Sequence, residues 1–284
     1  MVESYAMAER NFNALIGERW DQGKFLCVGL DPEMHKMPAH LKADDIERSI
    51  VEFNRAIVDA TKDLVCAFKP NSAFYEAHGE SGWRALKTTI EYILSEAPNV
   101  AVILDAKRGD IGNTNNGYVT AAFDDLRADA ITVHPYMGGE SLKEFFDRKE
   151  KGIIVLCRTS NSGAGEFQDL ELRGEALYKQ VARKFATSWN ANGNCGLVVG
   201  ATYPEEIAAV RTIAPNMPFL IPGVGTQGGD LEVSVKAGKD SRGKGIIVSV
   251  SRAILYASEK KDFAEVARVK AQEFHGAIQA ALVQ

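Results

Sequence analysis

Short apolar segments alternate with longer segments of helical period along the whole chain of 284 residues. Eight apolar segments have the length and composition of buried strands. They cover residues 25–30, 65–68, 100–104, 130–133, 153–156, 196–199, 218–221 and 246–250. Strands that alternate with helices predict parallel pairing through helical crossovers, and eight such units predict an α/β fold closed as a (β/α)8 TIM barrel.

The segments between these strands have helical periodicity. They cover residues 44–61, 82–95, 115–123, 139–149, 174–190, 204–213, 230–237 and 262–282. An extra helix near residues 5–18 is expected to close the bottom of the barrel. Because no linker or low-complexity run divides the chain, residues 1–284 are expected to form a single barrel domain.

Composition limits the partners and the compartment. The formal net charge of −5 argues against binding nucleic acid, whose phosphates attract basic surfaces. No signal sequence and no run long enough to cross a bilayer is present, so no membrane partner is expected. The four cysteines lie in or beside apolar runs without metal or redox spacing, which predicts reduced core thiols and a cytoplasmic protein.

Polar residues follow seven of the eight predicted strands. Because active sites of such barrels lie at the carboxyl ends of the strands, these residues are expected to meet at one site. They are Asp31, Lys69, Asp105 with Lys107, His134, residues 158–161, residues 223–227, and Ser251 with Arg252.

The sequence Leu-Asp-Ala-Lys-Arg-Gly-Asp-Ile-Gly-Asn-Thr at residues 104–114 is the most informative motif. Asp105 and Lys107 are two apart at a strand end and are expected to point the same way, with Asp110 and Thr114 on the outgoing loop. A buried lysine between two acids would stay protonated and could donate a proton. The alternative is a solvated turn after a strand.

This motif resembles that of the orotidine 5′-phosphate decarboxylase family, in its longer bacterial form (the type 2 subfamily). The resemblance extends from about residue 25 to residue 254. It implies decarboxylation of orotidine 5′-monophosphate to uridine 5′-monophosphate, the last step of de novo pyrimidine biosynthesis, without a metal or an organic cofactor. It also implies an alternating network of Lys69, Asp105, Lys107 and Asp110, in which Lys107 is the proton donor.

The resemblance assigns the other strand ends to parts of a nucleotide substrate. Asp31 would bind ribose hydroxyls, although an aspartate before a proline is also a common turn former. Ser160, with Thr159 next to it, would recognise the pyrimidine ring. Ser251 and Arg252 would help to bind phosphate, through the guanidinium and through backbone N–H groups at the start of a short helix.

A G-x-G-x-x-G pattern at Gly223, Gly225 and Gly228 matches the dinucleotide-binding fingerprint. That interpretation is weak, because Pro222 interrupts its start and the segment about twenty residues later is basic rather than acidic. Loops after strands seven and eight of these barrels often bind phosphate. We therefore expect a phosphate-binding loop with Gln227 as the side-chain donor.

The resemblance also implies a homodimer with shared active sites. In that arrangement Asp110, Ile111 and Thr114 reach into the site of the neighbouring subunit. The periodicity of the chain gives no sign of this.

Two other functions are alternatives to this one. A metal-dependent phosphosugar decarboxylase or aldolase of the same barrel group would carry an acid for magnesium on the second strand, where this chain has Lys69. A non-catalytic nucleotide-binding barrel would be expected to have lost a member of the lysine and aspartate network, and none is missing. His134 is expected to be a packed, hydrogen-bonded residue, and the remaining histidines lack ligand spacing, so no metal is expected.

Overall fold

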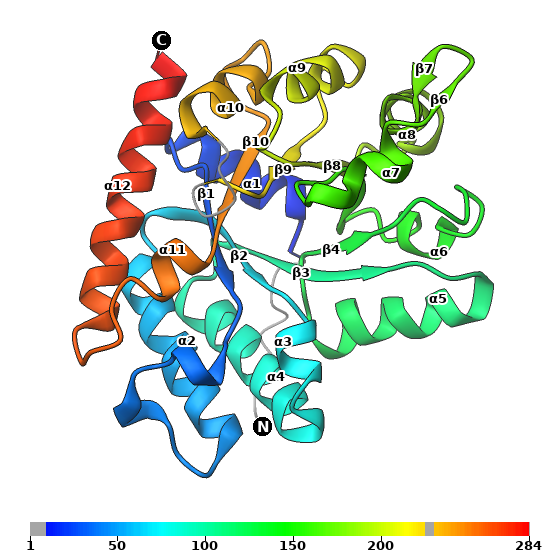
Figure 1. Cartoon of the computed structure of the whole chain (residues 1–284). Helices are drawn as coiled ribbons and strands as arrows, with labels where there is room; N and C mark the ends of the chain where they lie inside the picture. The colour runs from blue at the N-terminus through cyan, green and yellow to red at the C-terminus, as the bar shows by residue number, and fades with distance from the viewer. Residues whose placement is uncertain (1–9, 225–229, 284) are drawn as a thin grey trace, which may run out of the picture.

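Eight parallel strands close into a barrel in the computed structural model, which describes residues 10–224 and 230–283 (Figure 1). Around the barrel the strands follow the order β1-β10-β9-β8-β5-β4-β3-β2. Their bounds are β1 Leu26–Leu30, β2 Val65–Pro70, β3 Ala101–Arg108, β4 Ala130–Val133, β5 Gly152–Arg158, β8 Cys195–Val199, β9 Phe219–Ile221 and β10 Ile246–Val250. All eight predicted strands are therefore confirmed, as is the TIM barrel. A two-stranded hairpin of β6 (Glu171–Leu172) and β7 (Glu175–Ala176) was not predicted.

Helices cover the outside of the barrel. The longer ones are α1 Phe12–Asp21, α2 Ile46–Thr61, α4 Gly79–Glu96, α5 Gly112–Val119, α8 Leu177–Lys184, α9 Pro204–Ile213, α10 Leu231–Gly238 and α12 Phe263–Val283. Two of them continue as π-helices, α5 into Thr120–Asp125 and α8 into Phe185–Trp189. Single turns occur at η1 Met34–Lys36, η2 Ala39–Leu41, α3 Ala73–Glu76, α6 Lys143–Phe146, η4 Ser162–Ala164, α7 Gly165–Gln168 and α11 Arg252–Leu255.

One predicted helix is wrong. Residues 139–149 contain only the four-residue α6, flanked by turns. Two glycines precede it, and Gly138 has a φ of +90°, which a helix does not allow. Tight i to i+3 bonds follow it, from Arg148 N–H to Phe145 and from Lys151 N–H to Arg148. The N-terminal helix is α1 at residues 12–21, and the first part of the predicted segment lies outside the described residues.

The helix α1 covers the end of the barrel where the strands begin. The Trp20 indole N–H donates to the carbonyl of Ile246 at 2.8 Å, and the Arg19 guanidinium donates to the carbonyl of Val65, also at 2.8 Å. Ile246 and Val65 are the first residues of β10 and β2. The described part of the N-terminal helix thus lies at the bottom of the barrel.

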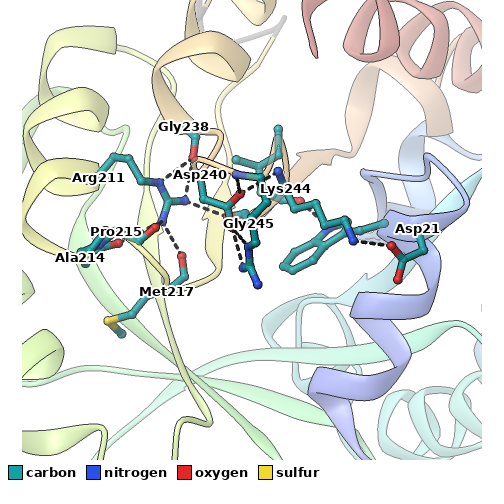
Figure 2. Close-up of polar contacts among 12 residues, drawn as sticks. Asp21, Arg211, Ala214, Pro215, Met217, Gly238, Asp240, Lys244 and Gly245 are labelled. Carbon is teal, nitrogen blue, oxygen red and sulfur yellow. Dashed lines mark hydrogen bonds and ion pairs between the residues drawn. The ribbon is translucent and has the colours of Figure 1, made fainter. Parts of the chain in front are cut away.

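A second set of polar contacts lies at the same end, and we call Asp21, Arg211, Asp240, Arg242 and Lys244 the Arg211 cluster. All but Arg242 are labelled in Figure 2. Arg211 is 9% exposed, and within the described residues its guanidinium donates to main-chain carbonyls of Gly238 at the end of α10, Met217 before β9 and Gly245 before β10. Asp240 accepts from the Arg242 side chain at 2.6 Å and from the Lys244 N–H at 2.9 Å. Lys244 in turn pairs with Asp21 of α1. The cluster thus joins the beginnings of two strands to α1.

Burial follows the alternation of elements. The five residues of β1, of β8 and of β10 are all buried, as parallel strands covered on both faces require. Among the described residues, no helix is both long enough and apolar enough to cross a membrane.

Candidate active site

Three of the predicted charged residues meet at the carboxyl ends of β2 and β3. The Asp105 Oδ2 accepts from Lys69 Nζ at 3.1 Å, and Asp105 Oδ1 accepts from Lys107 Nζ at 2.6 Å. The Thr132 hydroxyl, from β4, donates to the same Oδ1 at 2.9 Å. We call Lys69, Asp105, Lys107 and Thr132 the Asp105 cluster.

Burial differs sharply between the two lysines. The Lys69 side chain is 7% exposed and the Lys107 side chain is 49% exposed. Within one chain the buried lysine is Lys69, and the described residues bring only Asp105 to Lys107, so a single chain does not place a buried Lys107 between two acids. Lys107 contacts Asp105 and still reaches the open side of the site.

The opposite charges hold each other in the ionised state. Burial opposes ionisation of Asp105, but Lys69, Lys107 and the Thr132 hydrogen bond outweigh it, so the pKa of this carboxyl lies well below its usual range. Burial likewise opposes the charge on Lys69, yet Asp105 and Asp31 raise the pKa of this ammonium above its ordinary value. The pair is therefore ionised at neutral pH.

The Asp105 cluster lines a cavity of about 470 Å³. The lining includes Thr159, Ser160, Asn161 and Gln168 from the segment after β5. Ser160 therefore lines the same cavity as the charged cluster. Thr159 is fixed by Gln168, whose Oε1 accepts from the Thr159 N–H at 2.9 Å and whose Nε2 donates to the Thr159 hydroxyl at 2.8 Å.

A smaller cavity of about 170 Å³ shares Lys69 and Asp105 with the first and is also lined by Asp31, Ser251 and Arg252. The Ser251 hydroxyl donates to Asp31 Oδ2 at 2.6 Å. The other carboxylate oxygen, Asp31 Oδ1, is buried and has no hydrogen-bond partner within the described part of the chain. A buried acceptor in this state favours a ligand that supplies a donor, such as a hydroxyl group.

The loop after β9 forms another part of this rim. Pro222, Gly223 and Val224 line the smaller cavity, and Gly223 has a φ of +93°, where glycine is favoured. Gln227, predicted as a phosphate ligand, lies outside the described residues, as do Gly225 and Gly228. Because β9 is a strand of a closed barrel, the setting is not the open sheet of a dinucleotide-binding domain.

Asp110, Ile111 and Thr114 do not join the Asp105 cluster of their own chain. Ile111 is 57% exposed and Thr114 is exposed at the start of α5. The Asp110 backbone is held by Asn115, which accepts from the Asp110 N–H at 3.0 Å and donates to its carbonyl at 2.6 Å. The structure therefore unites three members of the predicted four-residue network and leaves the fourth on the rim.

His134 has the supporting position that was predicted. Its Nε2 lies 3.0 Å from the carbonyl of Gly109, and a Cβ at Gly109 would come within 2.6 Å of the same ring. The histidine thus packs under the loop that carries Asp110. In residues 10–224 and 230–283, no group of three or more His, Cys, Asp or Glu side chains is arranged to hold a metal ion.

Thr132 and Gln168 are two of the cavity residues that were not predicted. Thr132 is the one polar residue within the β4 sequence Ala-Ile-Thr-Val, and that interruption of an apolar strand was an available signal. Gln168 lies in the single turn α7, ten residues after the end of β5, where no local pattern distinguishes it.

Residues 24–267 match the family described as orotidine 5′-phosphate decarboxylase / HUMPS. A protein of Azoarcus sp. (strain BH72) named orotidine 5′-phosphate decarboxylase is 50% identical over 271 residues, which cover 95% of this chain and 99% of that protein. The solved structure of Leishmania donovani OMP decarboxylase is similar with a TM-score of 0.85 and 38% identity, covering 96% of this chain and 99% of that one. Leishmania donovani UMP synthase gives a TM-score of 0.86 and 40% identity over 96% of this chain, which spans 57% of that longer protein.

Proposed function

This chain belongs to the orotidine 5′-phosphate decarboxylase / HUMPS family, and we propose that it converts orotidine 5′-monophosphate to uridine 5′-monophosphate, the last step of de novo pyrimidine biosynthesis. The observation that carries this proposal is the Asp105 cluster. It aligns a buried carboxylate between two lysines at the wall of a cavity large enough for a pyrimidine nucleotide.

Each part of the substrate has a candidate partner. The phosphate binds Gln227, Arg252 and the backbone beside Ser251, and the ribose hydroxyls bind Asp31, whose buried Oδ1 supports that role. The pyrimidine ring lies against Ser160. Contacts remote from the reacting carbon supply binding energy that orients the ring and excludes water at the site of reaction.

The chemistry needs one bond broken and one proton transferred. The substrate carboxylate lies against Asp105, where two like charges in a poorly hydrated site oppose each other, and loss of carbon dioxide removes that conflict. The electron pair left on the ring carbon is stabilised by the Lys107 ammonium. Lys107 Nζ then donates its proton to that carbon, which completes uridine 5′-monophosphate. Neither a metal nor an organic cofactor takes part in this scheme.

Lys69 supports this reaction over a magnesium-dependent reaction on a phosphosugar. Magnesium sites in proteins are built from carboxylates and other oxygen ligands. The carboxylates that line the two cavities are Asp31 and Asp105, and both raise the pKa of the buried Lys69 ammonium. A divalent ion at Asp105 would have to displace a lysine that is already paired there.

We further propose a homodimer in which Asp110, Ile111 and Thr114 enter the partner's site. Exposed apolar side chains on the loops after β3, β4 and β5 support a covered surface here, since Ile111 is 57%, Tyr136 89% and Phe167 67% exposed. These three strands are neighbours in the barrel, so the three loops lie on one side of the rim.

The proposed compartment is the cytoplasm. All four cysteines are free and buried, as in proteins of reducing compartments. Burial raises the pKa of Cys27 to about 12, so this thiol stays protonated and unreactive.

The deciding experiment follows the ultraviolet change when purified protein meets orotidine 5′-monophosphate, with and without a metal chelator. We expect turnover that the chelator does not affect and that Lys107→Ala lowers by about a hundredfold to ten-thousandfold. A folded protein without turnover would refute the decarboxylase proposal, and turnover lost to the chelator would favour the metal-dependent alternative.

The shared site has its own test. Mixing Lys107→Ala with Asp110→Ala chains should restore roughly a quarter of wild-type activity, because half of randomly exchanged dimers are mixed and each has one intact site. If mass spectrometry shows that chains exchange and activity stays absent, the sites are not shared.

A further inference from the structure

The pairing of β3 with β4 is irregular at the Asp105 cluster. Leu104 pairs with Ile131, but the next pair joins Arg108 to Val133. Three residues of β3 therefore oppose the single residue Thr132. A bulge of this kind bends a strand and leaves backbone groups without a ladder partner.

The Thr132 side chain occupies the position that the bulge leaves open. Its Oγ1 accepts from the Lys107 backbone N–H at 2.9 Å and donates to Asp105 Oδ1 at 2.9 Å. A hydroxyl has a single proton, so the bond to the carboxylate directs a lone pair toward the N–H group. Thr132 is 1% exposed, which leaves little access for water to replace it.

The backbone of Lys107 needs such support. Its φ is +49°, in the left-handed region that side-chain-bearing residues seldom adopt. This conformation turns the lysine side chain back onto Asp105, so that Nζ lies 2.6 Å from Oδ1. Strained conformations persist only where surrounding contacts fix them, and the Thr132 hydrogen bond is one such contact.

We infer that Thr132 is a positioning residue, whose hydroxyl holds the Lys107 backbone in its left-handed conformation and the Asp105 carboxylate in the orientation that Lys107 meets. The inference rests on the proposed function, since it assigns Thr132 to the placement of the proton donor. Thr132 acts through Asp105 and Lys107.

The test compares Thr132→Val, which keeps the shape and removes the hydroxyl, with Thr132→Ser, which keeps the hydroxyl. For Thr132→Val we expect kcat to fall by about tenfold to a hundredfold with KM little changed, because misplaced groups lose transition-state stabilisation rather than ground-state binding. Thr132→Ser should return kcat to within a few-fold of wild type. A Thr132→Val enzyme with wild-type kcat, or a Thr132→Ser enzyme as slow as Thr132→Val, would overturn the inference.

A matched control separates positioning from loss of any buried hydroxyl. Thr61 is fully buried in α2, and its hydroxyl donates to the Ile57 carbonyl at 2.7 Å, away from both cavities. Thr61→Val should melt earlier than wild type and keep its kcat. If Thr61→Val loses as much kcat as Thr132→Val, the effect is general destabilisation and the inference fails.

A crystal structure of Thr132→Val distinguishes this inference from the proposed function. We expect the φ of Lys107 to leave the positive region or the contact between Lys107 and Asp105 to lengthen. Unchanged geometry would refute the positioning role. An inactive wild-type protein would instead refute the decarboxylase proposal, while the crystallographic comparison would still decide the role of Thr132.

Discussion

The Asp105 cluster and the Arg211 cluster lie at opposite ends of the same barrel and use buried charge in different ways. The Arg211 guanidinium donates hydrogen bonds to the main-chain carbonyls of Ala214, Pro215, Met217, Gly238 and Gly245 (Figure 2). The Asp105 cluster instead joins side chains to one another at a cavity wall.

The difference lies in what each cluster leaves available. Burial lowers the pKa of Arg211 to about 10, yet the group stays protonated at neutral pH and contacts the Phe219 ring at 3.6 Å. Arg211 lines neither cavity of the Asp105 cluster, whereas Asp21, Arg242 and Lys244 line a separate cavity of about 370 Å³ at their own end of the barrel. Lys107 is half-exposed, and Asp31 keeps a buried oxygen that has no partner among the described residues, so the other end of the barrel can still gain bonds from a ligand. The buried contacts of Arg211, which hold main-chain segments together, and the groups that can still bind a ligand thus lie at opposite ends of the barrel.

The largest expected effect tests the top of the barrel. Lys107→Ala should lower kcat by about a hundredfold to ten-thousandfold, the usual contribution of a general acid. Its free energy of unfolding should change by less than about 1 kcal/mol, because the lost ion pair is half-exposed and Asp105 keeps Lys69. Steady-state assays measure kcat, and urea titrations measure the free energy of unfolding. A large stability loss would show that this cluster also holds the fold.

The second prediction tests the bottom of the barrel. Arg211→Met should lower the free energy of unfolding by at least about 3 kcal/mol, because several buried carbonyls lose their donor at once. The folded fraction should keep its kcat.

Arg268 supplies the matched control for Arg211. It is an arginine on α12 that pairs with Asp63 at 2.8 Å near the surface. Arg268→Met should cost less than about 1 kcal/mol. Equal losses for the two variants, or a kcat defect in folded Arg211→Met, would contradict the separation of the two ends.

A smaller effect is expected in the pH dependence of stability that Asp240 contributes. Burial opposes ionisation of Asp240, but Arg242 and the backbone N–H groups of Lys244 and Arg242 lower the pKa of this carboxyl. A carboxylate whose folded pKa lies below its unfolded value of about 3.9 stabilises the fold above that pH and ceases to do so as pH falls through the folded pKa. The stability difference between wild type and Asp240→Asn should therefore shrink in acid. A difference that is constant with pH would exclude the charge as its source.

The smallest effect is expected at the edge of the Arg211 cluster. The ion pair of Lys244 with Asp21 joins side chains that are 32% and 67% exposed. Lys244→Ala should cost less than about 1 kcal/mol, and high salt should reduce that cost further. Thermal melts at two salt concentrations measure it, and a larger or salt-independent loss would place this pair among the buried contacts.

The barrel could be predicted from the sequence because its strands are buried on both faces. Runs such as residues 100–104 and 246–250 contain almost only apolar residues, and each ends where a charged or turn-forming residue begins. The prediction of a helix at 139–149 was wrong because the apolar residues there keep a helical spacing although the chain forms a series of single turns. These turns begin at Gly138 and Gly139. Periodicity alone does not register such breaks.

The sequence identified residues that lie at the site, but it did not predict how they contact one another. Asp105 and Lys107 do meet, but through a bulge and a left-handed lysine rather than the regular pleat that their spacing suggested. Thr132 lies on another strand, and its contact with Lys107 spans 25 residues of chain. Contacts of that range depend on the register of neighbouring strands, which no local pattern specifies.

At Lys107 the positive φ of the backbone favours a residue without a side chain, whereas the ion pair with Asp105 requires a charged side chain. Glycine would adopt this backbone without strain, whereas lysine supplies the ammonium. Selection for thermal stability alone would therefore favour glycine at this position and remove the proposed proton donor. At residue 107, a substitution that raises thermal stability is therefore expected to lower turnover.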